Sequence, residues 1–326
     1  MKRYNEIVFK AEHGIAYQCE QTSEDELVIN AVADMSLSKM FRLRRYETPE
    51  IPAGYRYAYG EWYDGYVIER IADGSLFTWV PVGYLEANGT SNGITFDEQF
   101  GRRNWNIYKD KFSDEDYYEP CVGELLMQSY SIKKYGGFYI STYLISENAN
   151  TGKPQSLPRQ VPWTDVGLEK AKMIAATMET GSEVKSHLVY GAEYDTMLEW
   201  FIETKSKSHE EVVLDSSTWG NYWKSSNPMY KPLETGSSDK YCANNIYDVA
   251  GNVDEWTQEY KISVPDPEKY ANKQDAEQKK RAYGVVRGGS FRVYGHSFPA
   301  AYRGECGVEE RFNTTGFRIA LFMRWG

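Results

Sequence analysis

Cysteine and histidine, the side chains that most often act as nucleophiles or metal ligands, are few and scattered in this sequence. The four cysteines form no C-x-x-C pair, so neither a zinc ribbon nor a disulfide framework is indicated. The four histidines lack the spacings that place two ligands on one helical face, which argues against a histidine metal site. P-loop, G-x-G-x-x-G and Ser/His/Asp signatures are also missing, so the sequence predicts no catalytic residue. The positions are Cys19, Cys121, Cys242, Cys306, His13, His187, His209 and His296.

Oxygen ligands do come together in one turn. Residues 251–256 read Gly-Asn-Val-Asp-Glu-Trp and offer a carboxamide, a backbone carbonyl and a carboxylate within a short stretch. This is the oxygen-only set that Ca²⁺ prefers. The alternative is a loop in which the Asn and Glu side chains bond to the backbone while Trp256 packs beneath them.

A second stretch favours recognition rather than catalysis. Residues 291–298, Phe-Arg-Val-Tyr-Gly-His-Ser-Phe, form an apolar and aromatic loop in an otherwise polar chain. When exposed, such a patch marks a binding site, and aromatic side chains are typical anchors of one. The alternative is that alternate members of the loop pack inward. We predict that the loop is exposed.

The elements expected to position these residues are of mixed type. Periodicity predicts helices over residues 164–178, capped by Thr164, and over residues 192–204. Residues 86–120 and 206–245 are typical of long loops. Strands are predicted at both ends of this region with the helices between them, which indicates an α+β fold whose terminal strands pair. The predicted strands cover residues 65–68, 76–82, 137–145, 284–290 and 316–323, with a hairpin turn at 72–74.

The chain divides into an appended N-terminal segment, residues 1–54, and one larger domain, residues 55–326. The first segment is charged, poor in glycine and interrupted by Pro49 and Pro52, and we expect a short helix over residues 27–45 within it. No apolar run reaches the length of a membrane helix or a signal peptide, so neither membrane insertion nor Sec export is predicted. Reduced thiols in a cytoplasm are the expectation.

Composition narrows the class of partner. The chain carries 37 basic and 47 acidic side chains, a net charge of −10, so nucleic acid is not expected as a partner. It also holds 27 Tyr, 13 Phe and 9 Trp, which favours a globular fold over a disordered one. The same aromatic side chains would suit a surface built for recognition.

Three motifs occur in a fixed order along the second half of the chain. They are Asn-Ile-Tyr-Asp-Val-Ala-Gly-Asn-Val-Asp-Glu-Trp at 245–256, Val-Arg-Gly-Gly-Ser at 286–290 and Gly-Phe-Arg-Ile at 316–319. Together they resemble the signature of the formylglycine-generating-enzyme (sulfatase-modifying factor) family, and the resemblance covers residues 60–326. It implies a C-type-lectin-like α+β fold, with a twisted antiparallel sheet, two helices and much ordered loop.

The resemblance also assigns roles to single residues. It implies a structural Ca²⁺ held by Asn252, the Val253 carbonyl and Glu255. Arg287 and Arg318 lie on the motifs, and we expect them to make buried charge-assisted hydrogen bonds rather than to bind a ligand.

The enzyme question depends on two positions after the second motif. Family members that oxidise a substrate cysteine resemble one another in holding copper(I) with two cysteines, three and eight residues past the Ser of that motif. Here those positions are Val293 and Phe298, which offer no soft ligand. The histidine cluster that holds iron in the related sulfoxide synthases is also absent from the sequence. We therefore expect no copper, no iron and no enzyme activity; a family-like oxidoreductase is the competing hypothesis.

The same domain is a binding scaffold in the variable proteins of diversity-generating retroelements. Their variable segment lies between the Gly-Gly-Ser turn and the Gly-Phe-Arg strand, and residues 291–315 occupy that place here. The resemblance implies a non-catalytic receptor-binding or display protein for a protein or glycan ligand, cytoplasmic or associated with a phage virion. An undiversified phage structural domain is the alternative, and the oligomeric state stays open. The expected ligand-binding residues are Phe291, Arg292, Val293, Tyr294, His296, Phe298, Tyr302, Glu305 and Phe312.

Overall fold

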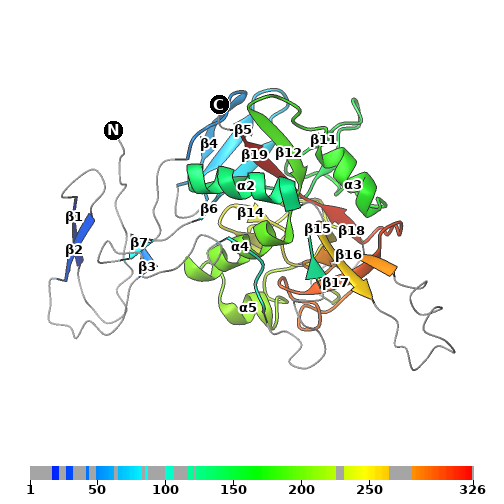
Figure 1. Ribbon diagram of the computed structural model, residues 1–326. Helices are drawn as coiled ribbons and strands as arrows, with labels where there is room; N and C mark the ends of the chain where they lie inside the picture. The colour runs from blue at the N-terminus through cyan, green and yellow to red at the C-terminus, as the bar shows by residue number, and fades with distance from the viewer. Residues whose placement is uncertain are drawn as a thin grey trace, which may run out of the picture.

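A computed structural model gives the fold, and it describes residues 17–21, 27–31, 42–43, 49–61, 65–82, 85–86, 100–105, 117–119, 122–224, 231–263 and 281–324. Two sheets, one antiparallel and one mixed, and four α-helices form the regular framework of this part of the chain (Figure 1). The fold is therefore α+β, as the sequence predicts.

The first sheet has six strands in the spatial order β12-β19-β9-β6-β5-β4, and every neighbouring pair is antiparallel. Its central strand β9 is buried on both faces. Phe138 and Ile140 join one core cluster and Tyr139 joins the other, because successive side chains of a strand point to opposite faces. The strands are β4 (Tyr55–Tyr59), β5 (Val67–Arg70), β6 (Leu76–Pro81), β9 (Gly137–Ser141), β12 (Val184–Leu188) and β19 (Ile319–Met323).

The second sheet has five strands. Four follow the order β17-β16-β15-β18, and β8 pairs with the far end of β15. The pairing of β15 with β18 is parallel, and the other pairings are antiparallel. The strands are β8 (Tyr117–Tyr118), β15 (Asp254–Ser263), β16 (Arg281–Arg287), β17 (Arg303–Gly307) and β18 (Thr315–Phe317).

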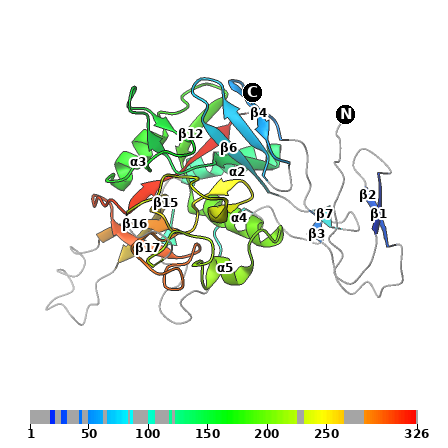
Figure 2. The ribbon, with the colours of Figure 1, turned by 180° about the vertical axis from the view of Figure 1, so that it is seen from behind.

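Helices cover both faces of the first sheet. The helices α2 (Val122–Tyr135), α4 (Gly191–Glu203) and α5 (His209–Val213) contribute to the core on one face, and α3 (Leu168–Ala175) to the core on the other (Figure 2). A short 3₁₀ helix, η2, covers Asp239–Tyr241. None of the described helices has the length and apolar composition needed to cross a bilayer.

Four two-stranded pairs complete the described structure, and all are antiparallel. They are β1 (Tyr17–Gln21) with β2 (Leu27–Ala31), β3 (Arg42–Leu43) with β7 (Leu85–Glu86), β10 (Ser146–Glu147) with β11 (Pro154–Gln155), and β13 (Cys242–Ala243) with β14 (Ile246–Tyr247).

Several expected elements are confirmed. The β5–β6 hairpin turns at residues 71–74, where the Asp73 carboxylate accepts a hydrogen bond from the Ser75 N–H and Gly74 has a φ of 80°. The helix expected over 192–204 is α4, and the strand expected from residue 137 is β9. The terminal strands β6 and β19 share one sheet, but they do not pair, because β9 lies between them.

Other expectations are wrong. Residues 27–31 form strand β2 rather than the start of a helix, and residues 32–41 and 44–45 of that expected helix lie outside the described residues. The helix α3 begins at Leu168 after the N-cap Gly167, so Thr164 does not cap it. The helices α2 and α5 and the strands β8 and β15 fall where no regular element was expected.

We predict that Phe317→Ala lowers the free energy of unfolding by about 3–5 kcal/mol, because this ring is fully buried between the sheets. Phe312→Ala is the matched control: its ring is 44% exposed, and the expected change is within about 0.5 kcal/mol. Urea titration of both variants measures the difference. Equal losses in the two variants would contradict this description of the core.

Candidate functional site

The segment between β16 and β17, residues 288–302, is irregular but firmly hydrogen-bonded. The Phe291 N–H donates to the Asn252 carbonyl at 3.0 Å, and the Val293 carbonyl accepts from the Trp223 N–H at 2.8 Å. Within the segment, the Phe298 N–H donates to the Tyr294 carbonyl at 2.9 Å. A loop backbone held by such bonds can present side chains without much loss of conformational entropy on binding.

The side chains of this segment divide between core and solvent. Phe291 is only 2% exposed, so its ring belongs to the interior and does not face solvent, where a ligand was expected to contact it. Val293 is half-buried and packs against the main core cluster. Phe298 and Tyr302 are also half-buried and pack edge to face, with ring centroids 4.6 Å apart.

Three predicted residues do form an exposed surface. Arg292, Tyr294 and His296 all face solvent, and the rings of Tyr294 and His296 stack at 5.3 Å with an interplanar angle of 27°. The Gly295 between them lies against Ser217, where a Cβ would meet the Ser217 backbone nitrogen at 2.5 Å. This close approach brings the loop against residues 216–223.

The two remaining predicted residues lie elsewhere. Glu305 is on β17 and pairs with Lys261 of β15, with 2.5 Å between Oε1 and Nζ. Phe312 precedes β18, which stands at the opposite end of the β17-β16-β15-β18 order. The residues expected to bind ligand therefore do not make one continuous site. The exposed cluster of Arg292, Tyr294 and His296 is the part of this set that could contact one ligand at the same time.

Both ends of the segment are fixed by a buried charge cluster, which consists of Asp195, Glu259, Arg287 and Arg303. The Arg287 guanidinium donates to Asp195 at 2.5 Å and to Glu259 at 3.1 Å. Arg303 likewise contacts both carboxylates, at 2.9 Å from Glu259 Oε1. Arg287 also donates to the carbonyls of Tyr302 and Ala301, so the cluster ties the end of β16 to the start of β17.

The charges of the cluster affect the pKa of two buried carboxyls, Asp195 within the cluster and Glu119 beside it. Burial opposes the charge on Asp195, but Arg287 and Arg303 outweigh it and hold the pKa of this carboxyl below its ordinary value. Glu119, by contrast, is buried near the charge of Glu259, and burial followed by this repulsion raises its pKa to about 8.

The turn at 251–256 is held by protein contacts. Asn252 Oδ1 accepts from the Leu233 N–H at 2.8 Å and from the Asn221 side chain at 3.2 Å. Glu255 pairs with the buried Arg318 at 2.9 Å; burial raises the pKa of Glu255 to about 7, and Arg318 opposes that rise. Asn252 Oδ1 and Glu255 Oε1 are therefore engaged by protein groups, whereas the buried Glu255 Oε2 lies beside the Arg318 guanidinium without a hydrogen bond from the described residues. The Arg318 charge would repel a cation beside Glu255.

These contacts favour the structural reading of the turn, in which Asn and Glu hold the loop. Val253 is fully buried there, and calcium binding through its carbonyl stays a prediction. Within the described residues, no cluster of three His, Cys, Asp or Glu side chains could hold a metal ion. The expectation that Arg287 and Arg318 make buried charge-assisted hydrogen bonds is confirmed.

The two cysteines whose thiols the structure describes, Cys242 and Cys306, are free and largely removed from solvent. Burial raises the pKa of Cys306 to about 12, and that of Cys242 to about 11. Cys306 lies 3.5 Å from the Glu310 carboxylate, which raises its pKa further.

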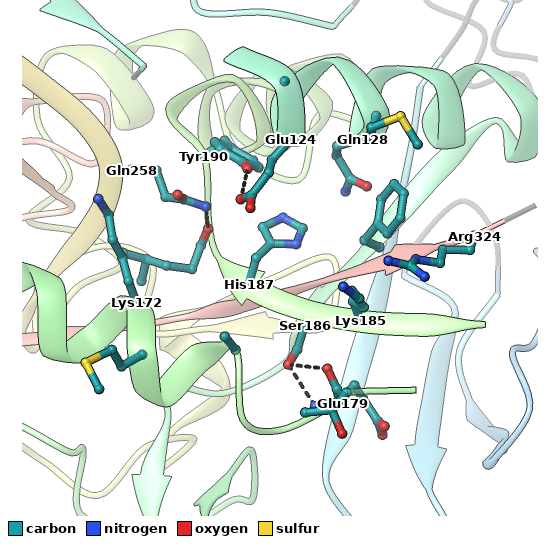
Figure 3. A pocket seen from close by; sticks show the side chains of 17 residues that line it. Glu124, Gln128, Lys172, Glu179, Lys185, Ser186, His187, Tyr190, Gln258 and Arg324 are labelled. Carbon is teal, nitrogen blue, oxygen red and sulfur yellow. Dashed lines mark hydrogen bonds between the residues drawn. The ribbon is translucent and has the colours of Figure 1, made fainter. Parts of the chain in front are cut away.

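A groove of about 870 Å³, which the sequence patterns did not predict, lies between α2, α3 and β12 (Figure 3). At its centre the His187 Nε2 lies 3.0 Å from the carboxylate of Glu193, which is fully buried. The Tyr190 hydroxyl, near it, contacts Glu124 at 3.3 Å. The strand pattern of Val184–Leu188, in which Lys185 and His187 alternate with buried residues, is the one sequence signal that could have pointed to the groove.

Antiparallel sheets, few helices and irregular backbone held by buried charges define this as an α+β domain built around ordered loops. Residues 190–322 match the family model described as "Sulfatase-modifying factor enzyme 1-like domain". The resemblance carried by the three sequence motifs is thereby confirmed.

Solved structures similar to this chain include a variable protein. Treponema denticola variable protein 1 is 15% identical over 57% of this chain and 85% of its own, with a TM-score of 0.38. PvdO from Pseudomonas aeruginosa is 17% identical over 58% and 82%, with a TM-score of 0.39. CarF is 14% identical over 58% and 87%, with a TM-score of 0.38. A search of curated proteins found no match.

We predict that Glu119→Gln changes how stability depends on pH. The folded-state pKa of Glu119, about 8, lies above its ordinary value of 4.5, so this group makes the protein less stable as the pH rises between those values. Glutamine does not titrate and keeps an oxygen for the Ala192 N–H. The variant should match the wild type near pH 4.5 and exceed it near pH 8 by more than about 1 kcal/mol.

Urea titrations at several pH values test this expectation. Glu309→Gln, at an exposed position, is the control and should leave the pH profile unchanged. A constant difference between Glu119→Gln and wild type at every pH would show that the Glu119 carboxyl does not titrate as described.

Proposed function

We propose that the chain is a non-catalytic ligand-binding protein that holds a protein or glycan against Arg292, Tyr294 and His296. The observation that carries the proposal is the exposed Tyr294–His296 stack on a hydrogen-bonded backbone. Two flat rings with few rotatable bonds lose little entropy on binding. The adjacent Arg292 adds a planar set of donors suited to a carboxylate or a sugar hydroxyl.

The positions that carry thiols in the oxidising members of the family support the absence of copper chemistry. Val293 contributes to the core, and Phe298 packs on Tyr302, so both positions serve the packing of the segment. Incubation with copper(I) and a cysteine-containing peptide should give neither stoichiometric metal binding nor peptide oxidation. Stoichiometric binding together with oxidation would favour the oxidoreductase hypothesis.

The burial pattern also supports diversification of residues 291–315. Arg292, Tyr294 and His296 can change without disturbing the core, whereas Phe291 and Ala300 are buried. If the segment is diversified, the gene should lie beside an adenine-rich near-repeat of the DNA for residues 291–315 and a reverse transcriptase. Their absence would favour an undiversified structural domain, such as one of a phage virion.

We predict that Tyr294→Ala and His296→Ala each weaken ligand binding by at least about tenfold, since exposed aromatic anchors commonly contribute 1–2 kcal/mol or more. Neither should change the free energy of unfolding by more than about 0.5 kcal/mol. Fluorescently labelled protein on a glycan array, and on intact cells of candidate host bacteria, measures binding.

Tyr130→Ala is the matched control, because Tyr130 is a similarly exposed tyrosine on α2 (51% against 42% for Tyr294). It should bind like the wild type. A ligand that binds Tyr294→Ala and His296→Ala as tightly as the wild type would place the binding surface elsewhere and contradict the proposal.

A further inference from the structure

The groove between α2, α3 and β12 shares no residue with the segment 288–302 and goes beyond the proposed function. Its volume of about 870 Å³ lies within the range of small-molecule sites, about 300–1,000 Å³. Such a site needs a few placed polar groups together with apolar lining, and the groove has both.

The first polar group is a histidine with a fixed orientation. The buried Glu193 carboxylate accepts from Gln128 Nε2 at 2.5 Å and from the Tyr190 N–H at 2.9 Å, and it contacts His187 Nε2 at 3.0 Å. A carboxylate only accepts hydrogen bonds, so Nε2 carries the proton that faces it. The other ring nitrogen, Nδ1, has no hydrogen bond within the described part of the chain.

Two cations, Lys185 and Arg324, lie on one side of His187. The side chains of Lys185 and Arg324 are exposed and make no ion pair with any described residue (Figure 3). The pairing of β12 with β19 brings these two side chains together. Lys185 lies opposite Phe322 in the register, and Phe322 is two positions before Arg324. Their proximity favours an anionic group of the ligand at this end.

The other ionisable groups of the lining limit the charge of that ligand. Lys172 is already paired with Glu169, and Glu179 with Arg70. Glu124 contacts only the neutral Tyr190 hydroxyl, so its negative charge remains opposite Lys185 and Arg324. Among the exposed side chains of the lining, the two cations Lys185 and Arg324 exceed the one carboxylate without an ion pair, Glu124, by one charge, which suits a ligand with a single negative charge.

The rims of the groove are apolar. Met127 of α2 is 46% exposed and Met173 of α3 is 71% exposed, and both line the groove. Exposed methionines are unusual on a polar surface, and their flexible thioethers adapt to ligands of varied shape.

We propose that the groove binds an amphipathic monocarboxylate. The carboxylate is held at Lys185 and Arg324 beside His187, and the apolar body lies against Met127 and Met173. The positive charges of Lys185 and Arg324 favour a ligand with one ionised acidic group. The side chains of Met127 and Met173 favour a hydrocarbon chain or ring over a sugar.

Isothermal titration of the full chain with octanoate at low ionic strength tests this proposal. Octanoate should bind at one site per chain, and octyltrimethylammonium, with the same chain and the opposite charge, should not. Octyl phosphate, with more negative charge, should bind more weakly than octanoate. Tighter binding of octyl phosphate, or equal binding of the cationic probe, would overturn the assignment.

Variants locate the site. Lys185→Met and Arg324→Met should each weaken octanoate binding about tenfold, since each removes one unpaired charge from the ligand's neighbourhood. Lys170→Met and Arg311→Met are matched controls at exposed positions outside the groove and should bind octanoate like the wild type. Met173→Gln should weaken octanoate more than acetate. Equal affinities for the groove variants and their controls would overturn the proposal, and thermal unfolding of each variant checks that it is folded.

Discussion

The charge cluster of Asp195, Glu259, Arg287 and Arg303 is the interaction on which the second half of the molecule depends. Its two carboxylates come from α4 and β15 and its two guanidinium groups from β16 and β17, so four elements meet at one fully desolvated point. Removing one member of such a cluster leaves a buried charge without compensation, at a cost of about 3–5 kcal/mol. Arg287 and Arg303 flank the segment 288–302, so the cluster fixes the positions of both ends of this segment.

This arrangement separates stability from recognition. The backbone of the segment is fixed by the arginines and by bonds to residues 216–223 and Asn252, whereas Arg292, Tyr294 and His296 contribute little to the interior. Substitutions at Arg292, Tyr294 and His296 are therefore expected to leave the fold unchanged. In the groove between α2, α3 and β12 the two roles are combined, because His187 lines the groove and is held by the fully buried Glu193.

Sequence periodicity predicted the elements whose apolar pattern is clean, such as α4 and β9. It failed for β15, because Glu255, Glu259 and Lys261 are charged residues that become buried through ion pairs, and a pattern of hydrophobicity cannot register that. The motifs correctly predicted buried roles for Arg287 and Arg318. They could not tell that Phe291 points inward while Tyr294 points outward. The groove could not be predicted from the sequence, because its lining extends from Gly123 to Arg324 and only the folded sheet brings these segments together.

The strands β18 and β19 are separated by the single residue Arg318, yet they belong to different sheets. Strand β19 stands between β12 and β9, and β18 stands at the edge of the second sheet, so the segment 315–323 joins both sheets at once. During synthesis on a ribosome, every earlier strand emerges before this segment does. Until then the nascent chain holds β12 and β9 without the strand that pairs with both of them, and chains with unpaired strand edges are the species that chaperones recognise.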